Sequence, residues 1–179
     1  VTVWTYVDTG PAQGNEAIQN GDFEIGDLSG WTVPSGSTVT VTQAQNPVSG
    51  DHVAFFGGLD NADESFYQPL NIANLEVNQA TVGFWLNLFG EESKADADYF
   101  CSAILNADQS QILIDLGCLN GIEATTTDFD PDNWKQVKID LDADEWALIK
   151  GQTINLAFQM FTDESETTTV YIDDVTFET

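Results

Sequence analysis

The sequence contains no arginine and very little basic charge of any kind. Its 179 residues include 4 Lys plus Arg, all of them lysines, against 30 Asp plus Glu, and the net charge at pH 7 is −26. Without guanidinium groups the chain cannot form the bidentate hydrogen bonds by which arginine binds phosphate. So acidic a body also repels polyanions over a screening length of about 10 Å at 0.1 M salt. The composition argues against nucleic acid and anionic membranes as partners, and favours divalent cations or neutral ligands.

Long hydrophobic runs are also missing, because no stretch approaches the roughly 18 apolar residues of a membrane helix. The richest run, Phe84 to Phe89, is interrupted by Asn87. The chain begins at Val1 rather than Met, which is typical of a processed chain or an excised module. We therefore expect no membrane insertion.

Cysteine is scarce, with Cys101 and Cys118 as the two examples. An even count and low lysine favour a secreted or cell-surface protein, in which a disulfide persists. A hairpin of Tyr99–Leu105 and Gln111–Leu116 would bring both cysteines near its open end, offset by two or three residues from direct opposition. A disulfide there would need a bulge or a diagonal bridge. The alternative is two buried thiols on neighbouring strands.

Despite its charge, the chain has the apolar content of a folded protein: 42% of its residues are hydrophobic and 11% aromatic. This much apolar surface can offset chain entropy, and the length suits one domain. Gly10, Pro11 and Gly14 are typical of a linker. We therefore predict an extra strand and linker over residues 1–19 and one domain over residues 20–179.

Short alternating or β-branched runs recur along the chain, separated by turn-forming residues, and sustained helical periodicity is almost absent. The predicted strands are Thr2–Val7, Ser37–Gln43, His52–Phe56, Ser65–Ile72, Ala80–Phe89, Tyr99–Leu105, Gln111–Leu116, Trp134–Leu141, Thr153–Phe161 and Thr168–Phe177. One short helix is expected between Asp142, its cap, and Gly151, with Glu145 completing a capping box. The pattern predicts an all-β protein, a β-sandwich jelly roll of two antiparallel sheets with one short helix.

Two segments go beyond composition. The opening run from Asn20 to Trp31, N-G-D-F-E followed by turn residues and Trp, resembles the start of carbohydrate-binding-module-like jelly rolls of the galactose-binding-domain-like group. The closing run Val170–Phe177, V-Y-I-D-D-V-T-F, resembles their last strand. The runs Trp134–Leu141 and Gly151–Phe158 are similar to the late strand pair found also in jelly-roll domains of secreted metallopeptidases and adhesins. Such domains include glycan-binding, adhesion and ancillary modules.

The resemblance implies a structural Ca²⁺ that ties the first strand of such domains to the last. The matching positions here are Glu24 and Asp173, with Asp51 as an additional ligand. Asp174 is the alternative to Asp173, because strand alternation would let only one of two neighbours face a given site. Carboxylates and carbonyls suit a hard cation of this kind.

Aromatic side chains supply a second hypothesis, since sugars stack their apolar faces on flat rings while amides bind their hydroxyls. Alternation along Val82, Phe84 and Leu86 assigns one face of that strand to the core and leaves Trp85 and Asn87 on the other. Trp85 is the leading candidate, with Asn87, Tyr67 and Tyr99 as further ligand-binding residues. Trp31, Trp134 and Trp146 are expected to pack structurally.

Signals for catalysis are weak. His52 is the sole histidine, no nucleophile motif accompanies it, and 30 acids make some carboxylate pairing inevitable. We therefore expect a non-catalytic, calcium-stabilised extracellular module that binds a neutral glycan or polysaccharide. The alternative is a structural or adhesion module of a larger secreted or cell-surface protein, with a protein or a neighbouring domain as partner.

Overall fold

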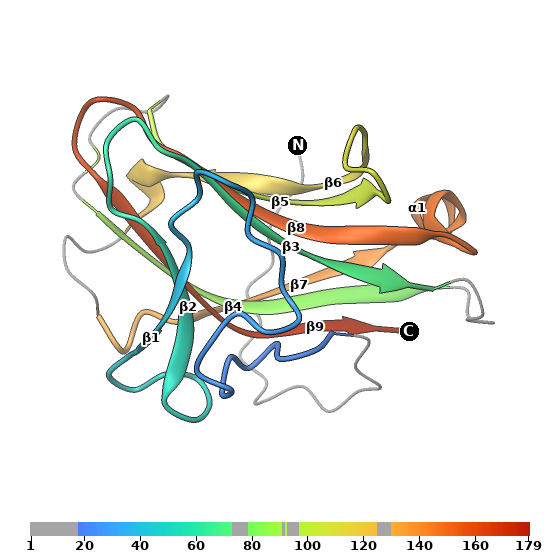
Figure 1. Cartoon of the computed structure of the whole chain (residues 1–179), viewed down its shortest axis with the longest axis horizontal. Helices are drawn as coiled ribbons and strands as arrows, with labels where there is room; N and C mark the ends of the chain where they lie inside the picture. The colour runs from blue at the N-terminus through green and yellow to red at the C-terminus, as the bar shows by residue number, and fades with distance from the viewer. Residues whose placement is uncertain (1–17, 73–78, 91, 93–96, 125–129) are drawn as a thin grey trace.

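The computed structural model describes residues 18–72, 79–90, 92, 97–124 and 130–179. Nine strands form two antiparallel sheets that pack face to face, as the edge-on view in Figure 1 shows. The strands are β1 (Thr40–Gln43), β2 (His52–Gly57), β3 (Asp63–Asn71), β4 (Ala80–Gly90), β5 (Tyr99–Asn106), β6 (Ile112–Asn120), β7 (Lys135–Leu141), β8 (Thr153–Phe161) and β9 (Thr168–Glu178). The predicted β-sandwich with one short helix is confirmed.

One sheet has five strands in the order β1-β2-β9-β4-β7, and the other has four in the order β3-β8-β5-β6. The predicted strand Thr2–Val7 lies outside the described residues, and the proposed division at residue 19 stays a prediction. The other nine predicted strands all form. No helix within the described ranges is long and apolar enough to cross a membrane.

The core between the sheets is dominated by phenylalanine. Alternate residues of each strand point inward, and Phe158 of β8 lies near the centre with no exposed surface. Its ring centroid lies 5.1 Å from that of Phe84 and 5.3 Å from that of Phe66. It also contacts Trp31 and Phe100, with centroids 6.1 and 6.2 Å away. These rings join both sheets into one apolar cluster.

The opening motif closes one side of this core. Phe23 and Trp31 are buried and stack with centroids 5.8 Å apart. The Trp31 indole N–H donates to the carbonyl of Asn20, and the backbone N–H of Val175 in β9 donates to Gly21. The segment before β1 is therefore held directly against the last strand.

Helix α1 (Ala143–Ile149) forms directly after Asp142, the capping residue from which the sequence predicted a helix. The Asp142 carboxylate accepts hydrogen bonds from the backbone N–H groups of Asp144 and Glu145, and the Glu145 side chain accepts from the Asp142 N–H. Trp146 and Ile149 are buried beneath the helix. Trp146 thus anchors the helix, and Trp31 packs in the core, as the sequence predicted.

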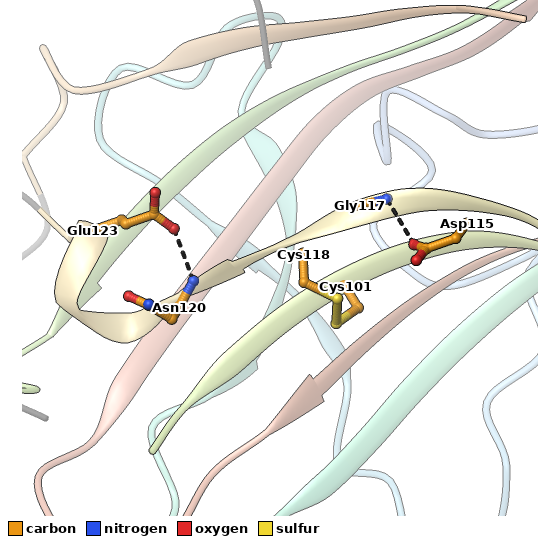
Figure 2. Close-up of a disulfide and its surroundings, with 6 residues drawn as sticks. All are labelled: Cys101, Asp115, Gly117, Cys118, Asn120 and Glu123. Carbon is orange, nitrogen blue, oxygen red and sulfur yellow. Dashed lines mark hydrogen bonds between the residues drawn. A yellow bond between two sulfur atoms is a disulfide. The ribbon is translucent and has the colours of Figure 1, made fainter. Parts of the chain in front are cut away.

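The β5–β6 hairpin carries a disulfide between Cys101 and Cys118 (Figure 2), whose Cα atoms are 4.1 Å apart. The expected offset between the cysteines is wrong, because they are directly opposite each other. Next to the turn, Leu105 pairs with Ile112, one residue beyond the Gln111 partner that the predicted hairpin implies. Two register shifts then each insert one extra residue of β6, which brings the two cysteines into direct opposition. At one of these shifts the Gly117 N–H donates to Asp115. The bulges that the spacing required are therefore present.

Phe158→Ala is expected to destabilise the fold by about 3–5 kcal/mol, because it opens a cavity where four other rings meet. Phe161→Ala is the matched control, since Phe161 lies on the same strand with 38% of its surface exposed and should cost under about 1 kcal/mol. Denaturant unfolding of both variants measures the difference. Equal losses would contradict the placement of Phe158 at the centre of the core.

Candidate functional site

The outer face of the five-stranded sheet carries a row of aromatic side chains. Phe55 of β2 pairs with Tyr171 of β9, which pairs in turn with Asn87 of β4. In the neighbouring row, Trp85 lies between Asp173 and Gln136. Because directly paired residues share a face of the sheet, these side chains all lie outside the core.

Tyr171 is the centre of this aromatic face. Its ring centroid lies 5.4 Å from that of Phe55 on one side and 5.4 Å from that of Phe89 on the other. Burial raises the pKa of the Tyr171 hydroxyl. Phe55, Phe89, Tyr171 and Trp85 are each half-buried, and therefore retain surface that a ligand can contact.

The four predicted ligand-binding residues divide between the two sheets. Trp85 lies on the aromatic face as expected. Asn87 shares that face but is fully buried, because its side-chain N–H donates to the carbonyl of Asp130, which covers it. Tyr67 and Tyr99 belong to β3 and β5, and lie on the outer face of the four-stranded sheet. The four residues therefore do not form one site.

The outer face of the four-stranded sheet is hollowed around the disulfide. The hollow has a volume of about 400 Å³ and is lined mainly by apolar side chains, including Cys101, Cys118, Ala103, Ala157, Ile112 and Phe161. Ile112 is 58% exposed at its margin. This face differs from the other one, because its apolar surface comes mostly from aliphatic side chains and sulfur.

The predicted metal ligands gather around the loop between β1 and β2. Asp173 accepts hydrogen bonds from the backbone N–H groups of Val48 and Ser49, at 3.0 and 3.1 Å, and Asp174 accepts from the Ser49 hydroxyl at 2.8 Å. The expectation that only one of the two acids would face the loop is wrong. A bulge opposite Phe84 leaves Asp174 with a φ of 47°, and this breaks the alternation.

Glu24 meets the same loop from the opening motif. Its Oε1 accepts from the backbone N–H groups of Asp51 and His52, at 2.9 and 2.7 Å, and its Oε2 lies 3.6 Å from His52 Nδ1. Burial alone would raise the pKa of Glu24, but these amide hydrogen bonds and His52 together hold it below its ordinary value. Asp51 contributes its backbone here, and its side chain is exposed.

Glu24, Asp173 and Asp174 thus converge on the β1–β2 connection, and we call these three acids together with that connection the acidic loop. Asp173 is fully buried, and burial together with the neighbouring charge of Asp174 raises its pKa to about 8. Burial, and the charges of Asp22 and Glu24, also raise the pKa of Asp174, whose Oδ2 is buried without a hydrogen bond. Burial thus disfavours the charged forms of Asp173 and Asp174. Glu24, Asp51, Asp173 and Asp174 do not include three acids whose carboxylate oxygens all lie within 4.8 Å of one another, so Ca²⁺ at these residues stays a prediction.

A second acidic group was not predicted. Among the described residues, Glu92, Asp98 and Asp163 are the three acids whose carboxylate oxygens all lie within 4.8 Å of one another. They come from the β4–β5 and β8–β9 connections, which lie far apart in the sequence, so no local spacing indicated them. Tyr171 also went unnoticed, although alternation between the core residues Val170 and Ile172 would have placed it outside.

No family model matches this chain, and no curated protein matches it. Several solved structures are similar to it. The chain is similar to TmCBM61, solved in complex with β-1,4-galactotriose, with a TM-score of 0.59 and 19% identity over 91% of this chain and 97% of that one. It is also similar to the CBM22-1 xylan-binding domain of Paenibacillus barcinonensis Xyn10C, with a TM-score of 0.54 and 15% identity over 95% and 96% of the two chains.

A third similar structure is the K1 cleaved adhesin domain of Lys-gingipain from Porphyromonas gingivalis, with a TM-score of 0.56 and 16% identity over 88% of this chain and 95% of that one. At such identities the likeness concerns the fold. The chain has the β-sandwich fold of carbohydrate-binding modules and of an adhesin domain, which confirms the resemblance drawn from its two end motifs.

Gly50→Ala tests the packing of the acidic loop. Gly50 has a φ of 51°, and an added Cβ would lie 2.0 Å from Cδ of Glu24, so the carboxylate must move away from the Asp51 and His52 N–H groups. The variant should lose about 2 kcal/mol of stability, from the backbone strain and from these hydrogen bonds. Gly151→Ala is the control, because Gly151 has a φ of 78° but no atom within 4 Å of an added Cβ. It should lose only the conformational cost, about 1 kcal/mol. Similar unfolding free energies would contradict the close approach of Glu24.

Proposed function

We propose that the protein is a non-catalytic carbohydrate-binding module that binds a neutral glycan or polysaccharide across the aromatic face of its five-stranded sheet. The observation that carries the proposal is the run of half-buried rings formed by Phe55, Tyr171 and Phe89, with the half-buried Trp85 on the same face. The likeness to carbohydrate-binding modules supports it at the level of the fold.

The chemistry of this face suits an uncharged sugar. Rings on adjacent strands offer apolar surface to the C–H faces of successive sugar units. Strand β7 adds polar groups at the margin, since Lys138 and Asp140 share the face of Gln136, and Asp140 is exposed. A net charge of −26 disfavours anionic polysaccharides. Binding would proceed by stacking and hydrogen bonding, without any covalent step.

We propose further that Ca²⁺ stabilises the module at the acidic loop. Glu24, Asp173 and Asp174 would hold the ion, with Asp51 of the β1–β2 connection as an additional ligand. The ion would offset the charge of carboxylates that burial keeps from water. It would also join the opening motif to β9, which the Val175–Gly21 hydrogen bond already connects. A secreted or cell-surface location agrees with the disulfide.

A second function has its own supporting observation. The hollow around Cys101 and Cys118, with the exposed side chains of Ile112 and Phe161, suits an apolar contact with a protein or a neighbouring domain. A structural or adhesion module of a larger protein would use this face. Tyr67 and Tyr99 lie on the same sheet and would belong to such a contact.

Trp85→Ala and Tyr171→Ala are each expected to weaken binding to a neutral polysaccharide at least tenfold, because each removes a stacking surface. A binding screen of neutral glycans in calcium buffer identifies the ligand, and calorimetry then compares the variants. Tyr67→Ala is the control on the opposite sheet and should bind like the parent protein. Loss of binding in Tyr67→Ala alone would move the site to the four-stranded sheet. The absence of any glycan ligand for the folded protein would favour the adhesion module.

Chelation of Ca²⁺ is expected to lower the melting temperature, since an ion bound only by the folded state adds to its stability. Glu24→Gln keeps the carbonyl-type acceptor for the two amides but removes the charge, and should shrink the calcium response of the melting temperature. Asp60→Asn, in an exposed loop, removes the same charge and should leave the response intact. An unchanged response in Glu24→Gln would exclude calcium from the acidic loop.

A further inference from the structure

The second acidic group lies where several strands end together. Glu92 and Asp98 lie at the two ends of the β4–β5 connection, and Asp163 follows β8, so two connections converge on one point. Their carboxylate oxygens are all within 4.8 Å of one another. The group is separate from the acidic loop, which is built from the opening motif, the β1–β2 connection and the second half of β9.

Asp98 is the fully buried member of this group. Its side chain has no exposed surface, and its Oδ1 accepts a hydrogen bond of 3.0 Å from the backbone N–H of Asp163. Its Oδ2 is buried and has no hydrogen-bond partner. Burial raises the pKa of Asp98, and the charge of Glu92 raises it further. One buried carboxylate oxygen of the group therefore lacks a hydrogen-bond donor at normal distance and angle.

A neutral oxygen lies beside these carboxylates. The hydroxyl of Thr168, at the start of β9, neighbours Asp98, but neither Thr168 Oγ1 nor Asp98 Oδ2 has a hydrogen-bond partner of normal geometry. Thr168 is itself fully buried. Thr168 lowers the pKa of Asp98 by hydrogen bonding, against the larger effect of burial. Its hydroxyl also adds a neutral oxygen beside the carboxylates, which a hard cation accepts as a ligand.

The short helix η1 (Gly121–Glu123) closes over the group, and only glycine fits at its first position. A Cβ on Gly121 would lie 2.3 Å from Thr168 Oγ1, 2.9 Å from the Cβ of Glu92 and 3.1 Å from the Cβ of Asp98. The Gly121 N–H donates to the backbone carbonyl of Asp98 at 2.8 Å. The backbone at Gly121 therefore packs directly against Glu92, Asp98 and Thr168 and covers one side of the acidic group.

We propose that Glu92, Asp98 and Asp163 bind a divalent cation, with Ca²⁺ as the best fit, at a site distinct from the acidic loop. Ca²⁺ binds oxygens at about 2.3–2.6 Å, so two oxygens on one ion can be separated by up to about 5 Å. The observed separation falls within this limit. Ca²⁺ also accepts irregular sets of carboxylate, hydroxyl and water oxygens, whereas Mg²⁺ demands a near-ideal octahedron.

A cation here would fix one end of the aromatic face. Thr168 pairs with Gly90, and the next pair along the ladder, Thr169 with Phe89, already belongs to that face. The ion would therefore hold together the ends of β4 and β9 beside the Phe89–Tyr171 ring pair. This inference stands on the acids themselves and does not depend on the nature of the ligand.

The test compares Asp98→Asn with Asp144→Asn, which removes one exposed charge from α1 at a distance from the group. Calorimetric titration of chelator-treated protein with Ca²⁺, and separately with Mg²⁺, measures the number of ions bound per chain. Asp98→Asn should bind one Ca²⁺ fewer than the parent and Asp144→Asn. Without metal, Asp98→Asn should melt at or above the parent temperature, because a buried charge has been removed; with Ca²⁺ it should melt lower.

The same stoichiometry and affinity in both variants would overturn the proposal, as would a drop in melting temperature of the same size with and without Ca²⁺. If Asp98→Asn does not fold, Asp163→Asn and Glu92→Gln carry the same expectation. Glu24→Gln should keep this ion, which separates the result from that for the acidic loop. Hydrogen exchange gives an independent readout, since Ca²⁺ should slow exchange at the N–H groups of Asp163 and Gly121.

Discussion

The antiparallel ladder that places β9 between β2 and β4 is the constraint on which the rest of the structure depends. Its alternation sends Val170 and Ile172 into the core and Tyr171 to the aromatic face. The bulge at Asp174 then turns two consecutive acids toward one loop. A slip of one residue would exchange inward and outward side chains, so core, aromatic face and acidic loop rely on a single register.

Electrostatic repulsion acts against the burial of carboxylates in this acidic chain, which has few positive side chains to offset it. Lysines are too few to pair with 30 acids, and buried carboxylates accept hydrogen bonds from the backbone instead. Asp173 uses the N–H groups of Val48 and Ser49, and the inward-facing Glu64 uses those of Thr38 and Gly57. Such bonds satisfy oxygens but leave the repulsion between neighbouring charges, which divalent cations would relieve.

The two outer faces of the sandwich have different surfaces and suit different partners. The five-stranded sheet presents adjacent rings with polar groups at its margin, which suits a sugar chain. The four-stranded sheet presents a hollow of aliphatic side chains around a disulfide, which suits a protein surface. The fold is shared by carbohydrate-binding modules and an adhesin domain, so it permits both uses. The side chains on each face, rather than the fold, therefore decide between them.

Local patterns in the sequence determined the nine described strands, the capped helix, the inward Trp31 and the outward Trp85, because each depends on the spacing of near neighbours.

Three features came only from the tertiary structure. The sheet that each strand joined separated Tyr67 and Tyr99 from Trp85, and it also brought Phe55 to Tyr171. Bulges aligned Cys101 with Cys118 and turned Asp173 and Asp174 to one loop. Glu92, Asp98 and Asp163 met because the ends of packed strands converge. Register and sheet order are set by long-range packing, which short-range spacing does not encode.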